Sequence, residues 1–223
     1  MARTPVVRWT IRSLLGTLAA CGTVLFPGAL LAQACIGSPA SPGQIAAGGT
    51  ASFSDGRTGY GGEAVMNLLG PFSIGGAYGV VDADDSEEKI TRYGLRGVYE
   101  FPSESPVSVC PSLQGEYTTT SSTFIGQHVD VNTLAIPVGM ALGTTLGNPV
   151  TAQVLPNAGA GLLYQRTQHS FPATGSTVSS ETGFYFNAGA TIAVWHIYAG
   201  AQVSTTTLED SNAVVTVSAG FRL

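Results

Sequence analysis

From residue 43 onward, apolar and polar residues alternate with a period of two in one segment after another. The last segment shows the pattern best. One of its faces carries Ala213, Val215, Val217, Ala219, Phe221 and Leu223, and the other carries Thr216, Ser218, Gly220 and Arg222. Side chains of a β-strand point alternately to its two faces, so the pattern indicates strands. We count ten such segments without a linker, and they predict one all-β domain over residues 43–223.

The polarity of the two faces distinguishes a membrane barrel from a soluble one. A soluble sandwich or lipocalin-like barrel also alternates, but its outward face carries Lys, Glu, Asp and Arg because water surrounds it. Here the polar face consists of Gly, Ser, Thr, Asn and Gln with few charges, and the apolar face carries no ionic residue on any strand. This favours an up-and-down antiparallel transmembrane β-barrel with its apolar face in lipid and its polar face in a narrow lumen.

Connection lengths support the same interpretation. Compact turns are expected at residues 70–71, 102–106, 147–149 and 195–196, and longer connections at 82–89, 118–130, 166–180 and 205–211. Bacterial outer-membrane barrels have short periplasmic turns and longer external loops. Residues 54–57 are the one short external connection. We expect strands of about 10 to 12 residues, which cross the apolar band when tilted. A count of eight strands remains the alternative, because the turn at Trp195 and His196 is very tight.

Aromatic residues fall into two groups when the strands are threaded alternately up and down. One group lies toward the long loops and contains Tyr60, Tyr78, Tyr93, Tyr117, Tyr164 and Phe184. The other lies toward the short turns and contains Phe72, Phe101, Trp195 and Phe221. Tyr, Trp and Phe collect where lipid headgroups meet hydrocarbon, so the two groups predict two interfacial girdles.

With these features, residues 43–223 resemble the small outer-membrane β-barrel proteins of the OmpA and OmpX type and the wider porin-like barrel-domain family. The most specific element is the C-terminal strand, which is similar to the assembly signal of this group through Val215, Val217, Gly220, Phe221 and Leu223. Leu223 replaces the usual terminal Phe, and the aromatic residue is shifted to Phe221. The resemblance implies an outer-membrane location, insertion by the barrel assembly machinery, and lipid and lipopolysaccharide as partners.

The N-terminus has the composition of a secretory signal peptide. Arg3, Arg8 and Arg12 precede an uncharged apolar stretch at residues 13–31, and Ala32 and Ala34 occupy the −3 and −1 positions of a cut after residue 34. We therefore predict a signal peptide over 1–34 and a short periplasmic segment over 35–42. A transmembrane anchor is an alternative that the helix breakers at residues 27–28 disfavour. Lipidation at Cys21 or Cys35 is another.

Two cysteines remain after this cleavage, Cys35 and Cys110, in a chain exported to an oxidising compartment. They could form a disulfide. The alternative is that Cys110 is a free thiol, buried as a small apolar residue.

Composition and charge exclude two classes of protein. Charged residues make up 10% of the chain and apolar residues 44%, which is not the composition of a disordered protein. The chain has 9 basic and 14 acidic residues, and three of the basic ones belong to the signal peptide. The acidic remainder has the wrong sign for a nucleic-acid partner.

A few charged residues lie on the predicted lumen face: Glu63, Arg92, Arg96, Glu100 and Glu116. We interpret them as an ion-pair network, because unpaired charges in a confined interior are costly. The sequence thus predicts a non-enzymatic barrel with a structural or surface-interaction role, whose extracellular ligand is unknown. The alternative is a narrow passive channel lined by these charges.

A third hypothesis is an outer-membrane hydrolase of the omptin type. It would use Asp82, Asp84 and Asp85 with His128 or His169. Loop tips are acidic for solubility more often than for catalysis, and Ser170 beside His169 lacks an acid partner. No metal site and no cofactor are predicted.

Overall fold

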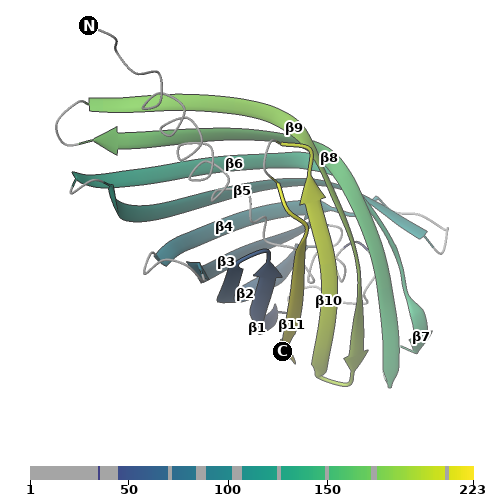
Figure 1. Ribbon diagram of the computed structural model, residues 1–223. Helices are drawn as coiled ribbons and strands as arrows, with labels where there is room; N and C mark the ends of the chain where they lie inside the picture. Colours follow the sequence, from purple (N-terminus) through teal and green to yellow (C-terminus); the bar gives the residue numbers. More distant parts are fainter. Residues whose placement is uncertain are drawn as a thin grey trace, which may run out of the picture.

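The computed structural model describes Cys35 and residues 45–69, 72–83, 89–101, 107–124, 127–148, 151–171, 175–208 and 211–223. The predicted cleavage residues Ala32 and Ala34 lie outside this part of the chain, as does Cys21. The strands are β1 (Ile45–Ser54), β2 (Arg57–Leu69), β3 (Phe72–Ala83), β4 (Lys89–Tyr99), β5 (Val107–Phe124), β6 (Gln127–Thr144), β7 (Leu146–Asn148), β8 (Ala152–Phe171), β9 (Gly175–Val194), β10 (Ile197–Thr206) and β11 (Val214–Arg222) (Figure 1). In the described residues, no helix is both long and apolar enough to cross a bilayer.

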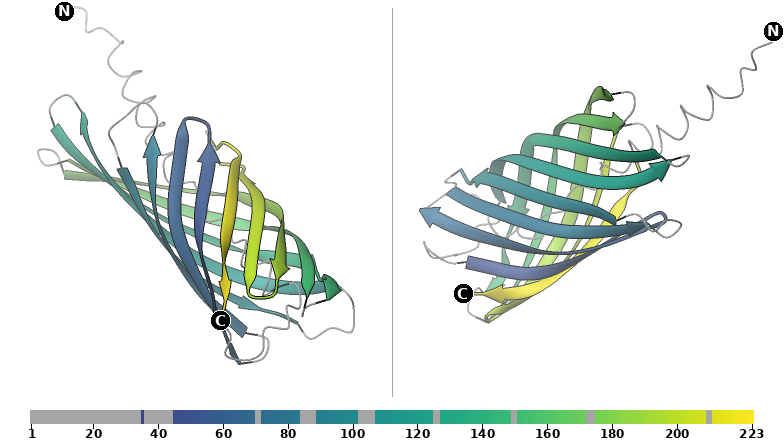
Figure 2. Two further views of the ribbon diagram at one scale, coloured as in Figure 1. Left: turned by 90° about the horizontal axis from the view of Figure 1, so that it is seen from below. Right: turned by 90° about the vertical axis from the view of Figure 1, so that its left-hand side faces the viewer.

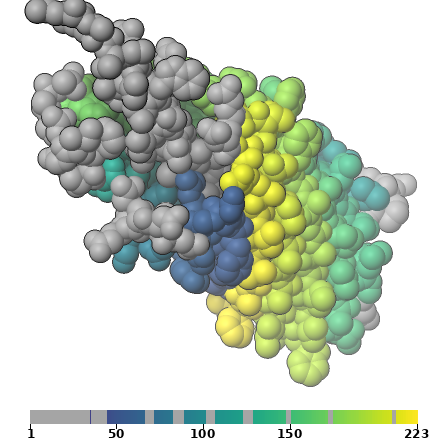
Figure 3. All heavy atoms as spheres, viewed as in Figure 1, coloured from purple at the N-terminus to yellow at the C-terminus, as the bar shows by residue number. Residues whose placement is uncertain are grey.

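Ten long strands close into an antiparallel up-and-down barrel, and the three-residue β7 is a short addition beside β8. Each strand pairs with its neighbours in the sequence, β1 pairs with β11, and β6 pairs with β8 (Figure 2). At the seam, the backbone N–H of Ile45 donates to Leu223 and that of Leu223 donates to Ile45. In Figure 3 the seam is continuous where β1 (blue) meets β11 (yellow). The prediction of ten strands is therefore confirmed, and the alternative of eight is wrong.

The barrel is apolar outside and polar inside. All ten residues of the two predicted girdles are exposed, including Trp195, which is 70% exposed. The buried side chains include a large set of threonines, serines and glutamines, among them Gln153, Thr191 and Thr216. Water would not tolerate this outer surface over so many strands, whereas hydrocarbon requires it.

Four strands are longer than the sequence analysis expects. β5 and β6 each contain 18 residues, and β8 and β9 each contain 20. Much of residues 118–130 and 166–180, which the sequence analysis assigns to loops, continues the strands as two tall hairpins. The reason is that Thr, Val and Ser pair well across strands without an apolar face. The alternation of apolar and polar residues marks only the part of a strand that lies in lipid.

Tyrosines from β9 and β10 fill much of the lumen. Tyr198 is 1% exposed and packs with Ala193, Ala46 and Val65. Tyr185 packs with Leu163, Ala135 and Leu208, a residue of the β10–β11 connection that turns inward. The backbone N–H of Thr207 donates to Phe184 at 2.9 Å and holds this connection against β9.

Glycines make room for the Tyr198 ring. A Cβ atom on Gly48 would overlap the Tyr198 hydroxyl and the backbone carbonyl oxygen of Ala219. A Cβ on the neighbouring Gly49, which faces outward, would lie 3.8 Å from the nearest atom. Gly48 is therefore a packing requirement, and Gly49 is not.

We expect Gly48→Ala to lower the free energy of unfolding by about 2 kcal/mol, because backbone must move to relieve the overlap. Gly49→Ala is the matched control and should stay within about 0.5 kcal/mol of the wild type. Urea unfolding in detergent, followed by the gel-mobility difference between folded and boiled protein, measures both. Equal stability of the two variants would contradict this account of the lumen.

Candidate functional site: a charged lumen and a protruding sheet

Four of the five predicted lumen charges form one cluster on β2, β4 and β5. In the strand register, Glu63, Ala77, Gly94 and Glu116 follow one another in a single row across β2–β5. Arg92 and Arg96 lie on β4, two residues to either side of Gly94. We call Glu63, Arg92, Arg96 and Glu116 the charge cluster. Ala77 and Gly94, the two small residues in the middle of this row, leave space for the two arginine side chains.

Each arginine of the charge cluster has its own acid. Arg92 Nε lies 3.6 Å from Glu116 Oε1, and both side chains are almost completely buried. Arg96 is attracted to Glu63, which is 8% exposed. Guanidinium and carboxylate groups that face each other across a narrow lumen offset the cost of removing them from water. The structure thus brings together four residues that the sequence places on three separate strands.

Glu100 lies apart from the charge cluster. It accepts a hydrogen bond of 2.6 Å from Ser108 on β5, close to the short-turn end of the barrel. The structure therefore places Glu100 against Ser108, and its membership of an ion-pair network stays a prediction. One polar neighbour is enough for Glu100 because it is only partly buried at the barrel end.

The lumen has little free volume beside the charge cluster. The cavity lined by Glu63, Ala77, Gly94, Arg96 and Gln114 measures about 20 Å³. This is room for about one water molecule. Inward-facing side chains of β8, including Leu155, Leu163 and Gln153, are at most 1% exposed. This arrangement suits a packed interior better than a water-filled pore.

No protein-family model and no curated protein matches the sequence. Among solved structures, the chain is similar to the outer membrane protease OmpT from Escherichia coli, with a TM-score of 0.50, 8% identity, and coverage of 81% of this chain and 93% of that chain. It is also similar to the N-terminal β-barrel domain of Pseudomonas aeruginosa OprF (TM-score 0.42, 14% identity, coverage 82% and 98%). A third similar structure is Ail, the attachment invasion locus protein of Yersinia pestis (TM-score 0.41, 16% identity, coverage 82% and 99%).

The likeness to OmpT, together with the apolar exterior and polar lumen of the closed sheet, decides the class. The chain has the outer-membrane β-barrel fold. Its outer wall faces lipid, and the even number of strands returns both ends of the barrel domain to the short-turn side, which is periplasmic in such barrels. The tall hairpins therefore lie on the extracellular side.

Cys35 lies inside the barrel near its periplasmic end. It is completely buried and packs with Cys110 and Val98, the inward-facing residues of β5 and β4, and with Ala141. Both thiols are free in the structure. A disulfide between them stays a prediction, as does the assignment of residues 35–42 to the periplasm, because residues 36–42 lie outside the described part of the chain.

Of the acid and base residues of the hydrolase hypothesis, the structure describes the side chains of Asp82 and His169, and it does not bring these two together. Asp82 is exposed on the outer face of β3, and His169 is buried on the inner face of β8, with β4, β5 and β6 between the two strands. Ser170 follows His169 on β8 and therefore faces the opposite side. Asp84 and Asp85 lie outside the described residues, and so does the side chain of His128.

The predicted assembly signal is the strand that closes the barrel. Val215, Val217, Phe221 and Leu223 face outward, and Gly220 faces inward beneath Tyr198. Arg222 Nη2 donates to the Trp195 carbonyl at 2.6 Å and ties β11 to the β9–β10 turn. Recognition of this strand by the assembly machinery stays a prediction.

The feature that sequence reasoning missed is a sheet above the membrane. The upper parts of β5, β6, β8 and β9 form it, and they extend past the other strands in Figure 1. Polar contacts hold it, including Tyr117 to Asn132 at 2.9 Å and Ser121 to Asp130 at 2.7 Å. The available signal was the uninterrupted run of Thr and Ser at residues 118–123 and the frequent Ser, Thr and Gln of the other three segments.

Removing only one partner of the Arg92–Glu116 pair should destabilise the barrel more than removing both. We expect Glu116→Gln to lower the free energy of unfolding by about 3 kcal/mol, because Arg92 stays buried without its counter-charge. The double variant Arg92→Met with Glu116→Leu should recover most of this loss. Glu181→Gln, at an exposed acid on β9, is the control and should be neutral. Urea unfolding of all four proteins, together with the single variants Arg92→Met and Glu116→Leu, measures the coupling, and additive losses in the double variant would argue against a pair.

Proposed function

We propose that this outer-membrane barrel is a surface-interaction protein with a filled lumen, and that it binds partners through the free edge of its protruding sheet. The outer-membrane lipids, lipopolysaccharide and the barrel assembly machinery are its proposed structural partners. The observation that carries the proposal is the free edge of β9. No enzymatic activity is proposed.

The free edge of β9 comprises residues 175–183. In the described pairings, β10 pairs with β9 only as far as Tyr185. Beyond it, Phe184 is hydrogen-bonded to Thr207. Residues 175–183 pair with β8 alone. Residues 175–182 are all exposed. Such an edge presents a row of backbone N–H and C=O groups to solvent. An extended peptide can add to it as a further strand, with main-chain hydrogen bonds providing much of the affinity.

The sequence of this edge lacks the usual protection. In natural edge strands, Lys, Pro or a bulge prevents unwanted pairing with another strand. The segment GSTVSSETG contains neither Lys nor Pro, and Glu181 is its one charged residue. Its pairing with β8 runs without a register shift from Gly175 to Val194. A long edge without a bulge and with one charged residue supports a role in binding.

The packed lumen supports the structural role over the alternative of a narrow channel. A conducting path needs continuous water, and the charge cluster leaves room for about one molecule in its cavity. We therefore expect the wild-type barrel to give no measurable conductance in a planar bilayer. Arg92→Ala with Arg96→Ala should open a small pore, because the two long side chains leave the lumen together.

Lys89→Ala with Arg166→Ala, which removes two exposed cations, is the matched control for this conductance measurement. Gel mobility before and after boiling verifies that each variant is folded. Conductance steps in the wild-type protein would replace the proposal with the channel alternative. An unchanged conductance in the Arg92 and Arg96 variant would exclude a gating role for the charge cluster.

Binding at the β9 edge can be tested with fluorescent eight-residue peptides of alternating Thr and Val. We expect hydrogen exchange in residues 175–183 to slow when the peptide is added, because its main chain would pair with the free edge. Val178→Lys with Ser180→Lys should abolish the protection by placing charges along this edge. Thr58→Lys is the control, since β2 is paired on both sides there. Protection that persists in the edge variant would contradict the proposed binding mode.

A further inference from the structure

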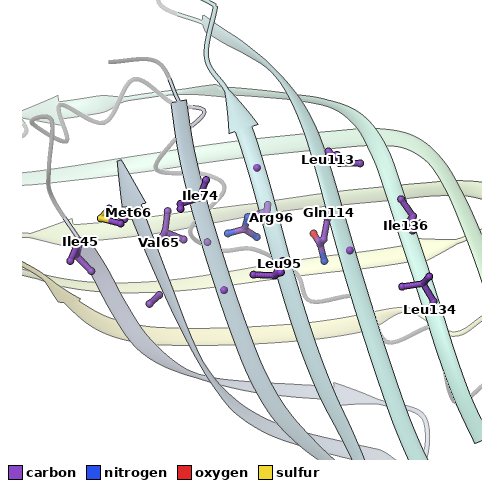
Figure 4. A pocket seen from close by; sticks show the side chains of 15 residues that line it. Ile45, Val65, Met66, Ile74, Leu95, Arg96, Leu113, Gln114, Leu134 and Ile136 are labelled. Carbon is purple, nitrogen blue, oxygen red and sulfur yellow. The ribbon is translucent and has the colours of Figure 1, made fainter. Parts of the chain in front are cut away.

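An apolar groove crosses the outer wall of the barrel from β1 to β6 (Figure 4). Its volume is about 750 Å³, and its lining is almost entirely apolar. Most of its residues belong to the lipid-facing side of the wall, including Ile74, Leu95, Leu113 and Ile136. It therefore opens toward the bilayer and lies on a different surface from the protruding sheet.

Small residues create the groove. In the strand register, Ala64, Gly76, Leu95, Gly115 and Ile136 form one outward-facing row across β2–β6, and three of the five have at most one side-chain carbon. A Cβ atom on Gly115 would meet nothing within 4 Å. The wall is thus hollowed along the row instead of being covered by side chains.

The pairing of β5 with β6 is interrupted at the same place. Leu113 pairs with Val138 and Glu116 pairs with Ala135, but within these two described strands Gln114 and Gly115 form no ladder pair. Pro137 stands opposite Gln114 and has no N–H to donate. The interruption lies directly under the Gly115 end of the groove.

The row immediately above the groove carries the interfacial tyrosines and a cation. Gly62, Tyr78, Tyr93, Tyr117, Leu134 and Arg166 follow one another in this row across β2–β8. The rings of Tyr78 and Tyr93 lie 5.4 Å apart. Tyrosine marks the level of lipid headgroups, and two residues of strand rise about 6–7 Å. The groove therefore lies in the outermost hydrocarbon on the extracellular side.

Arg166 is placed to contact a headgroup. It is exposed on the outer face of β8 and stands directly opposite Leu134, which lines the groove. Among the residues that the structure describes, no ion pair joins Arg166 to an acid. A guanidinium at this level binds phosphate through charge-assisted hydrogen bonds.

We propose that the groove binds an acyl chain of a phosphorylated lipid of the outer leaflet, lipopolysaccharide, and that Arg166 holds a phosphate of its lipid A. The groove receives the hydrocarbon chain beneath the tyrosine row, and the cation beside Leu134 meets the headgroup above it. The depth of the groove and the sign of the charge at its rim together select this occupant. A phospholipid of the inner leaflet would have its headgroup at the opposite end of the barrel.

Native mass spectrometry of the barrel purified from outer membranes tests the site. The probes are lipid A with two phosphates, the same lipid A after removal of its phosphates, and phosphatidylethanolamine. We expect Arg166→Gln to weaken binding of phosphorylated lipid A about tenfold, the effect of one hydrogen bond to a charged group, and to leave binding of the dephosphorylated form unchanged. Gly115→Leu should fill the groove and weaken both forms of lipid A.

Two control variants match these changes. Lys89→Gln neutralises another exposed outward cation, and Ala199→Leu enlarges an outward residue of β10 away from the groove. Neither should alter lipid A binding. If Gly115→Leu does not show the mobility shift of a folded barrel, Ala64→Leu fills the same row and replaces it.

Three results would overturn the inference. Equal binding of phosphorylated and dephosphorylated lipid A by the wild type would remove the headgroup contact. Unchanged binding in the groove-filling variant would remove the chain site. Equal binding of phosphatidylethanolamine would show that the outer wall binds surrounding lipid without specificity. This site rests on the proposed partnership with lipopolysaccharide, but none of these outcomes affects the β9 edge, so the proposed peptide binding is tested separately.

Discussion

The structure depends on one constraint, which is that no backbone N–H or C=O group can remain unpaired in hydrocarbon. The sheet satisfies it by closing on itself. β1 pairs with β11 at one seam, and β6 pairs with β8 where the short β7 ends. The reciprocal hydrogen bonds of Ile45 and Leu223 bring the C-terminal residue into this closure. The C-terminal strand is thus paired on both sides, with β1 and β10, as every other strand of the wall is.

Closure with ten strands encloses a lumen, and the side chains that face it must fit one another in size. The hydroxyl group of Tyr198 needs the space that Gly48 and Gly220 leave. Each arginine of the charge cluster needs both an acid and a small residue beside it. Large and small side chains therefore complement each other across strands that are distant in the sequence. A soluble protein would achieve this with apolar residues. Here the outer face takes the apolar residues, and many polar residues face the lumen.

The sequence predicts those parts of the fold that lipid dictates. Alternation of apolar and polar residues identifies every strand of the wall, and the aromatic residues identify both interfaces, because lipid imposes the same condition on each strand. The height of β8 and β9 was not predictable in this way, since above the membrane both faces meet water. The position of Cys35 in the lumen, and the placing of the row that contains Arg166 next to the row that contains Gly115, depend on register. Register relates residues of different strands, and no single segment contains that information.

The same constraint explains where the two candidate binding surfaces lie. A free strand edge cannot exist in hydrocarbon. Residues 175–183 of β9, which have no partner strand on the side away from β8, can therefore lie only above the level of the lipid. A gap in the ladder within the membrane must be small and covered, as at Gln114 and Gly115, where β5 remains paired with β4. The bilayer therefore divides the surface by ligand. The proposed main-chain recognition of peptides is confined to the protruding sheet, whereas the proposed site for a hydrocarbon chain lies in the hollow of the lipid-facing wall.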